Sequence, residues 1–259
     1  TVEPIFTNAP AFTPTERAPS LVATTNTGFP SLALIKATTD LSSRERRSIA
    51  IFRRSSPETP SDITDEIYEH MTYQDKYENN YEHVLIPKAF PGAADRTLVC
   101  NSLGKSASAT GWRLGWCLHP PHLSDLYRGV HDQLVAMSPH PQQFASLAFF
   151  TLLDEYFKEE LHTRYQMRLS ILADALTQVG FGVVPPEGAY YLFVDYRGVH
   201  QLKEFSPMDA AMYMMQEVGV AVVPGDNFYG KSPDGQNYLR FAACRSLSDV
   251  KAAIVKVRA

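Results

Sequence analysis

The sequence predicts an α/β fold in which a larger α/β part is followed by a smaller α+β part. Between residues 61 and 175, compact apolar segments such as Thr97–Ser102 alternate with turns and amphipathic helical patterns. After residue 176, several short strands follow one another closely, which favours a separate small sheet. Residues 1–60 follow neither pattern. We therefore expect an N-terminal arm over 1–60, a large domain over 61–175 and a small domain over 176–259.

The composition excludes several classes of protein. Of the 259 residues, 44% are hydrophobic and 20% are charged, and the formal net charge is −4. This balance predicts no nucleic-acid partner, and no apolar run reaches the roughly 18–20 residues that a membrane span needs. The first residues also lack the features of a signal peptide. Three cysteines without CxxC spacing argue against a disulfide scaffold and against a metal site. We expect three buried thiols in a reducing compartment, the cytoplasm, with the mitochondrion as an alternative.

Each segment from residue 43 onwards has a pattern that predicts its element. Strands are expected near the start of 63–73 and within 97–102, 112–118, 182–196, 219–225 and 238–244. Helices are expected within 43–54, 119–137, 142–162, 165–179, 207–218 and 246–258. Gly180 ends the helix over 165–179 as a C-cap. Glu66 and Glu69 follow the first of these strands, and we expect both to be exposed.

Lys105 lies among small residues in the segment NSLGKSASATGWRLGW, residues 101–116. A Walker A loop would need a glycine where Val99 stands, so this segment does not cradle a triphosphate. A lysine that forms a Schiff base must often be uncharged, which requires a partly buried, apolar setting. The small neighbours also leave room for a flat cofactor. Lys105 is therefore a candidate for the lysine that binds pyridoxal 5'-phosphate, the alternative being a lysine in solvent.

A pyridoxal-phosphate site needs further groups, and each has a candidate. Asp65 is a carboxylate that can stay ionised beside the protonated pyridine nitrogen, and Tyr68 can hydrogen-bond the phenolic oxygen. Ser102 and Arg113 flank Lys105 and can face a phosphate, although a strand-end cap and a salt bridge are their ordinary alternatives. Arg240 is a lone arginine in an apolar strand, where it needs a carboxylate partner.

Two more positions have open alternatives. Arg240 can instead pair with an acid across the sheet, and Arg245 competes with it for the carboxylate role. Tyr190 and Tyr191 are candidate aromatic residues of a substrate pocket, but the alternation of the strand places at least one of them in the core.

The motifs together resemble a known family. DEIYEH, S-x-x-K-x-x-x-x-T-G-W-R-x-G-W, EGAYYLFVDY, GVAVVPGDNF and YLRFAAC occur in that order. They resemble the class I/II aminotransferases of fold type I, and most of all the subgroup of kynurenine and glutamine transaminases. The resemblance covers residues 61–259. It implies an incomplete fold type I large domain, a small domain, and a homodimer that transfers an amino group from an amino acid to a 2-oxo acid.

The resemblance also implies a role for each candidate residue. Lys105 would bind pyridoxal 5'-phosphate and move the proton during catalysis. The cofactor would further contact Asp65, Tyr68, Ser102 and Arg113. The substrate would contact Arg240, through its α-carboxylate, and Tyr190. An aromatic or glutamine-like amino donor fits the aromatic residues of the small domain.

The N-terminal part departs from the family pattern. The family carries an N-P-x-x-P-T-G block upstream of the DEIY aspartate, whereas Lys36 or Ala37 stands here where its asparagine is expected. RRSSPETPSD replaces the strand before the aspartate, and prolines are rare in a central strand. The chain therefore resembles an N-terminally truncated or divergent member. Two alternatives stay open: a non-catalytic paralogue that acts as an interaction or structural module, and a pyridoxal-phosphate C–S lyase on the same fold.

Overall fold

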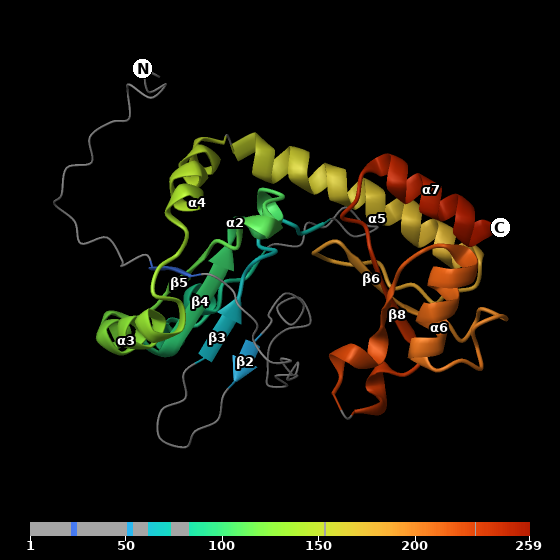
Figure 1. Ribbon diagram of the computed structural model, residues 1–259, viewed down its shortest axis with the longest axis horizontal. Coiled ribbons are helices and arrows are strands. Elements are labelled where there is room, and N and C mark those ends of the chain that lie inside the picture. Colours follow the sequence, from blue (N-terminus) through green and yellow to red (C-terminus); the bar gives the residue numbers. More distant parts are fainter. Residues whose placement is uncertain (1–21, 25–50, 54–61, 74–82, 153, 231) are drawn as a thin grey trace.

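The computed structural model describes residues 22–24, 51–53, 62–73, 83–152, 154–230 and 232–259. These residues form two lobes joined by the long helix α5, Leu161–Gln178 (Figure 1). The first lobe contains a five-stranded sheet and the second a three-stranded sheet. This mixed architecture confirms the α/β class.

The first sheet has the order β1-β5-β4-β3-β2. Its strands are β1 (Val22–Thr24), β5 (Gly115–Leu118), β4 (Thr97–Ser102), β3 (Asp62–Asp65) and β2 (Ile51–Arg53). β3 and β4 are parallel, while the other neighbours are antiparallel. Because parallel strands end at the same edge of a sheet, the residues that follow β3 and β4 lie near one another.

The polypeptide turns sharply at the end of β4. Thr97 and Val99 point into the core, as the alternation of a strand requires. Ser102 then caps the short helix α2 (Leu103–Ser106), because its Oγ accepts a hydrogen bond from the Gly104 N–H at 3.1 Å. This turn carries Lys105 on α2, at the same edge of the sheet as the end of β3.

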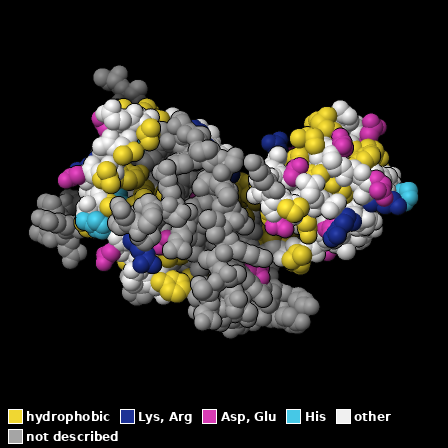
Figure 2. Space-filling model, turned by 90° about the horizontal axis from the view of Figure 1, so that it is seen from below, with side chains coloured by type: hydrophobic (Ala, Val, Ile, Leu, Met, Phe, Trp, Pro, Cys, Tyr) yellow, Lys and Arg dark blue, Asp and Glu magenta, His cyan; other side chains and the backbone are white. Residues whose placement is uncertain are grey.

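Besides α2, the helices described in the first lobe are α1 (Ile86–Ala89), α3 (Ser124–Val135) and α4 (His140–Ala145). α3 buries none of its residues. Leu126, Val130 and Leu134 recur every four residues on one face of α3 and are 53–75% exposed. Figure 2 shows hydrophobic side chains at the surface on the left of the molecule, where the first lobe lies. The first lobe therefore presents an apolar helix face.

Two expected helices differ from the structure. The expected helix over 142–162 is wrong, since α4 ends at Ala145 and a 3₁₀ turn and a π-turn occupy Ser146–Thr151 and Tyr156–Glu160. Leu152 takes an extended conformation with ψ 141°, which ends the helical path. The expected helix over 43–54 lies largely outside the described residues, and its described part, Ile51–Arg53, is strand β2.

The second sheet has the antiparallel order β6-β8-β7. Its strands are β6 (Tyr191–Asp195), β8 (Tyr238–Ala242) and β7 (Val223–Pro224), and its helices are α6 (Pro207–Tyr213) and α7 (Leu247–Arg258). The π-turn Met214–Val218 extends α6 over the rest of the expected helix. Ser206 and Ser246 cap α6 and α7 by accepting backbone N–H groups at 3.2 and 3.1 Å.

The main core lies between α5 and the second sheet. It includes the buried residues Leu169, Leu172, Leu176, Leu192, Val194, Leu239 and Phe241. The domain boundary expected at residues 175 and 176 falls inside α5. α5 therefore belongs to the packing of the second lobe while it also joins the two lobes.

Candidate active site

Lys105 meets the second lobe at the hydroxyl of Tyr190. Its Nζ donates a hydrogen bond to the Tyr190 hydroxyl at 2.7 Å. Tyr190 is buried and immediately precedes β6, and the preceding Ala189 has φ 59°. The same Nζ lies 5.8 Å from the centroid of the Tyr68 ring. The lysine of α2 is thus held among aromatic side chains from two different segments.

The tyrosines around Lys105 form a connected cluster. The Tyr68 hydroxyl donates to the Tyr191 hydroxyl at 3.0 Å, and the rings of Tyr68 and Tyr190 pack edge to face with centroids 5.5 Å apart. Burial, together with the neighbouring Tyr191 hydroxyl, raises the pKa of Tyr68 well above its usual range. Tyr68 therefore stays protonated at neutral pH and can donate a hydrogen bond to an acceptor in the site.

Asp65 ends β3 at the sheet edge that Lys105 also borders. Its Oδ1 accepts the Ile67 N–H at 3.4 Å, and part of the side chain reaches solvent. Desolvation by the surrounding protein raises the pKa of Asp65, and the charge of Glu66 adds to this. The Ile67 N–H and the charge of Lys105 act in the opposite direction. A cation placed beside this carboxylate would favour its ionised form.

Ser102 and Arg113 make local contacts around α2. The Ser102 hydroxyl caps α2, as described above. Arg113 has the left-handed conformation φ 55°, ψ 41°, its side chain is exposed, and one Nη donates to the Thr110 carbonyl at 3.0 Å. The shared role of these two residues in binding a phosphate stays a prediction.

Arg240 lies in β8 between two aromatic rings. Its guanidinium carbon is 4.3 Å from the Tyr191 ring centroid and 4.4 Å from that of Phe228. Its Nε is buried and, among the described residues, has no hydrogen-bond partner. Arg245, the competing candidate, is exposed and pairs instead with Asp249 at 3.5 Å. A buried guanidinium N–H without a partner can donate a hydrogen bond to a carboxylate oxygen of a ligand.

Several contacts of the site were absent from the sequence prediction. Tyr191 and Phe228 enclose Arg240, and only their register on the second sheet and the following turn brings them there. Glu66 is buried and pairs with His83, with 2.7 Å between Oε2 and Nε2. Glu69 is half-buried and accepts a hydrogen bond from Asn101. The expectation that both glutamates are exposed was wrong, because the chain after β3 turns back against β4.

The cysteines are not all buried. Cys117 is buried and Cys100 is partly buried, but Cys244 is exposed. The expectation failed for Cys244 because β8 ends at Ala242 and Cys244 lies in the loop before α7.

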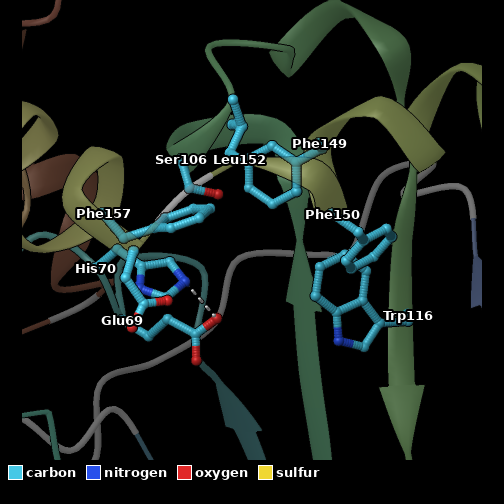
Figure 3. Close-up of a pocket in the computed structure, with 9 residues that line it drawn as sticks. Glu69, His70, Ser106, Trp116, Phe149, Phe150, Leu152 and Phe157 are labelled. Atoms are coloured by element: carbon cyan, nitrogen blue, oxygen red, sulfur yellow. Dashed lines mark ion pairs between the residues drawn. The ribbon is translucent and has the colours of Figure 1, made fainter.

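A separate cavity of about 290 Å³ opens beside α2 (Figure 3). Its wall is mostly aromatic and includes Trp116, Phe149, Phe150 and Phe157. His70 lines it as well, pairs with Glu69 at 3.4 Å and packs on the Phe157 ring with centroids 4.6 Å apart. None of the predicted site residues lines this cavity, although Ser106 next to Lys105 does.

Two broader features concern the described part of the chain. It contains no group of three or more His, Cys, Asp or Glu side chains arranged to hold a metal ion. None of its helices combines the length and the apolar character that crossing a membrane requires.

Known proteins are similar to this chain in sequence and in fold. The kynurenine–oxoglutarate transaminase of Dictyostelium discoideum is 31% identical over 202 residues, which cover 71% of this chain and 44% of that protein. The methionine aminotransferase of Escherichia coli is 30% identical over 76% of this chain and 48% of its own length. The solved structure of N-succinyldiaminopimelate aminotransferase from Mycobacterium tuberculosis superposes with a TM-score of 0.67 at 28% identity, covering 76% of this chain and 48% of that one.

The likeness therefore extends over most of this chain but only part of its relatives. The chain spans just under half the length of the curated relatives named here. The sequence model of the family described as "Aminotransferase class I and II" matches residues 63–257. The order of the motifs, the two-lobed fold and this match agree, and the chain belongs to the class I and II aminotransferase family.

Proposed function

We propose that this protein takes part in a pyridoxal-phosphate-dependent transfer of an amino group from an amino acid to a 2-oxo acid. The observation that carries the proposal is a continuous set of contacts from Lys105 to Arg240. Lys105 donates a hydrogen bond to Tyr190, and Tyr68 donates one to Tyr191. The Tyr191 ring in turn faces the guanidinium of Arg240. An amine and a carboxylate-binding group at the two ends of one aromatic cluster suit an amino-acid substrate.

Lys105 is the residue proposed to handle the proton. When bound, the cofactor supplies an electron sink for the negative charge that develops at the substrate's α-carbon. The Nζ of Lys105 would take the proton from that α-carbon and return a proton afterwards. Proton transfer by a positioned side chain is typically worth about 10²–10⁴-fold in rate. The hydrogen bond from Nζ to Tyr190 supports a defined position for this amine.

Asp65 and Tyr68 are proposed to hold the two polar positions of the cofactor ring. The carboxylate of Asp65 would accept a hydrogen bond from the pyridinium N–H. The positive charge of the pyridinium would favour the ionised carboxylate and so offset the desolvation that raises the pKa of Asp65. The Tyr68 hydroxyl would donate to the phenolic oxygen in place of its present bond to Tyr191. Ser102 and Arg113 would bind the phosphate, which requires the guanidinium to turn away from the Thr110 carbonyl.

Arg240 is proposed to bind the α-carboxylate of the substrate. Its Nε lacks a partner among the described residues, and the rings of Tyr191 and Phe228 fix the plane of the guanidinium. A planar fork held in this way suits a bidentate carboxylate. Tyr190 would border the same space. The aromatic surroundings favour an aromatic or other apolar amino donor, in keeping with the kynurenine and methionine transaminases among the relatives.

A homodimer is part of the proposal. The apolar face of α3, on which Leu126, Val130 and Leu134 are more than half exposed, supports association with a second copy. Light scattering coupled to size-exclusion chromatography would measure the mass of the particle in solution and decide between monomer and dimer.

The proposed activity is tested by a donor screen with matched lysine variants. Purified protein with added pyridoxal 5'-phosphate is mixed with 2-oxoglutarate and single amino acids, and glutamate formation is measured. We expect turnover in the unmodified protein and in the Lys251→Ala control, which changes an exposed lysine of α7, but not in Lys105→Ala. Equal activity in Lys105→Ala would overturn the assignment of the lysine. A folded protein without turnover for any donor would favour the non-catalytic alternative.

A further inference from the structure

The structure contains a pair of cysteines that the proposed amino transfer does not use. Cys100 on β4 and Cys117 on β5 lie directly opposite each other in the antiparallel register of the two strands. Residues opposite each other in such a pair have Cα atoms about 4.5–5.5 Å apart. This separation falls inside the range of about 4.4–6.8 Å that a disulfide spans. The Cα separation of this register is therefore compatible with a disulfide.

The side chains of the pair point to the same face of the sheet, because residues directly opposite each other in an antiparallel pair share a face. The Sγ–H of Cys117 donates a hydrogen bond to the Leu118 carbonyl oxygen at 3.7 Å. The neighbouring Cys100 thiol lowers the pKa of Cys117, while the neighbouring Cys117 and burial raise the pKa of Cys100. The two sulfur atoms therefore influence each other's ionisation, and the thiolate is the reactive form of cysteine.

The pair is reachable by a small oxidant. Cys117 is 2% exposed, but Cys100 is only partly buried. Cys100 also pairs in register with Asp65 of β3, whose side chain reaches solvent.

We propose that Cys100 and Cys117 are a peroxide-sensitive dithiol that closes to an intramolecular disulfide between β4 and β5. In the first step, one thiolate attacks hydrogen peroxide, the O–O bond breaks, and a sulfenic acid and hydroxide form. In the second step, the neighbouring thiol displaces the sulfenic oxygen, the S–S bond forms, and that oxygen leaves as water. Two thiols and one peroxide yield one disulfide and two waters, so the two electrons lost by the sulfurs reduce the peroxide.

The position of this bond gives it a consequence for the candidate site. The closed loop would span residues 101–116, which include Ser102, Lys105 and Arg113. A cross-link of this kind removes conformational freedom from the unfolded chain. Oxidation is therefore expected to stabilise the fold and to tie down the turn that carries Lys105. This inference does not depend on whether the chain transfers an amino group.

The test is a mass measurement on a protein without its exposed cysteine. Cys244→Ser removes the thiol that can link two molecules, and the variant is then treated with hydrogen peroxide. We expect a product lighter by two hydrogen atoms, a peptide map that joins the segments around Cys100 and Cys117, and reversal by dithiothreitol. The thermal midpoint should rise by several degrees on oxidation and fall again on reduction.

Single-cysteine variants distinguish the mechanism from general oxidation. In the Cys244→Ser background, Cys100→Ser and Cys117→Ala should give no such product and should instead accumulate a sulfenic acid, which dimedone traps when the protein is denatured in its presence. The peptide map of the parent protein decides the matter even if one of these variants does not fold. The proposal is overturned if both thiols of the parent remain open to alkylation after peroxide, or if they are oxidised only to separate sulfinic acids.

Discussion

The Nζ of Lys105 and the hydroxyl of Tyr190 are 2.7 Å apart, although 85 positions separate the two residues in the chain. The lysine belongs to the short helix after β4 and the tyrosine to the segment before β6. This single hydrogen bond therefore joins the two lobes at the candidate active site. It also limits the directions in which the amine can approach a carbonyl group.

Tyr190→Phe removes this hydrogen bond and little else. Tyr190 is 6% exposed, and phenylalanine keeps the ring contacts with Tyr68 and Tyr165. A hydrogen bond to a charged or chargeable group is worth about 1.5 kcal/mol or more, which corresponds to roughly tenfold in rate or affinity. We expect the reaction of pyridoxal 5'-phosphate with Lys105 to slow by about that factor, measured by stopped-flow absorbance.

Tyr213→Phe is the control for this change, because it removes a hydroxyl from α6, away from Lys105. An unchanged rate in Tyr190→Phe, with the fold intact by circular dichroism, would show that the hydrogen bond does not position the lysine.

Arg240→Met tests the proposed carboxylate site. Methionine keeps an unbranched apolar stem between the rings of Tyr191 and Phe228 but loses the guanidinium. A lost charge-assisted contact of about 3 kcal/mol raises the KM for an amino-acid donor roughly 100-fold. Arg245→Met, at the exposed competing arginine, should leave KM unchanged. The role of Arg240 is contradicted if the two variants have the same KM.

Asp65→Asn has an effect on stability whose sign follows from the raised pKa of Asp65. A carboxyl whose pKa is higher in the folded state makes its stabilising contribution when protonated, below the unfolded value of 3.8, and loses it as pH rises. The amide resembles the protonated acid. We therefore expect Asp65→Asn to be more stable than the unmodified protein at neutral pH, with the difference closing in acid.

Asp195→Asn is the matched control with the opposite sign. A hydrogen bond from Arg197 lowers the pKa of Asp195, so its charged form stabilises the fold at neutral pH and this contribution is lost as pH falls. Urea denaturation at several pH values measures both variants. Destabilisation of Asp65→Asn at neutral pH would contradict the account of its surroundings.

Leu239→Ala tests the packing of the second lobe. Leu239 is fully buried in β8, the middle strand of the three-stranded sheet. Truncation of such a side chain removes buried surface and leaves a cavity, which costs about 2–5 kcal/mol of unfolding free energy. Val255→Ala, on the exposed face of α7, should cost less than about 0.5 kcal/mol. Similar losses for both variants, measured by chemical denaturation, would show that the core lies elsewhere.

The sequence predicted the elements that have a strong local pattern. β4 was recognised from a compact apolar segment before small residues, and α7 from its serine cap and helical spacing. The helix expected over 142–162 failed, because hydrophobic spacing does not distinguish an α-helix from the 3₁₀ turn at Ser146–Thr151. Ile51–Arg53 became a strand because β3 offers it an antiparallel partner, which no local pattern reveals.

The sequence suggested residue types for the candidate site but not their contacts. The small residues around Lys105 led to the prediction of a cofactor lysine, and the lone Arg240 in an apolar strand led to the prediction of a carboxylate partner. The bond from Lys105 to Tyr190 and the rings on both sides of Arg240 depend on how two lobes and three strands align. Such alignment is a property of tertiary packing, which the sequence pattern does not contain.

Reductive trapping of the cofactor tests most directly whether Lys105 binds pyridoxal 5'-phosphate. Pyridoxal 5'-phosphate is added to the purified protein, the mixture is reduced with borohydride, and the modified residue is located by peptide mass spectrometry. We expect a visible absorbance band and a single stable modification on Lys105. Both should be absent from Lys105→Ala and present in Lys251→Ala. A folded protein that carries no modification, or carries it equally on exposed lysines such as Lys251, would contradict the claim that Lys105 binds the cofactor.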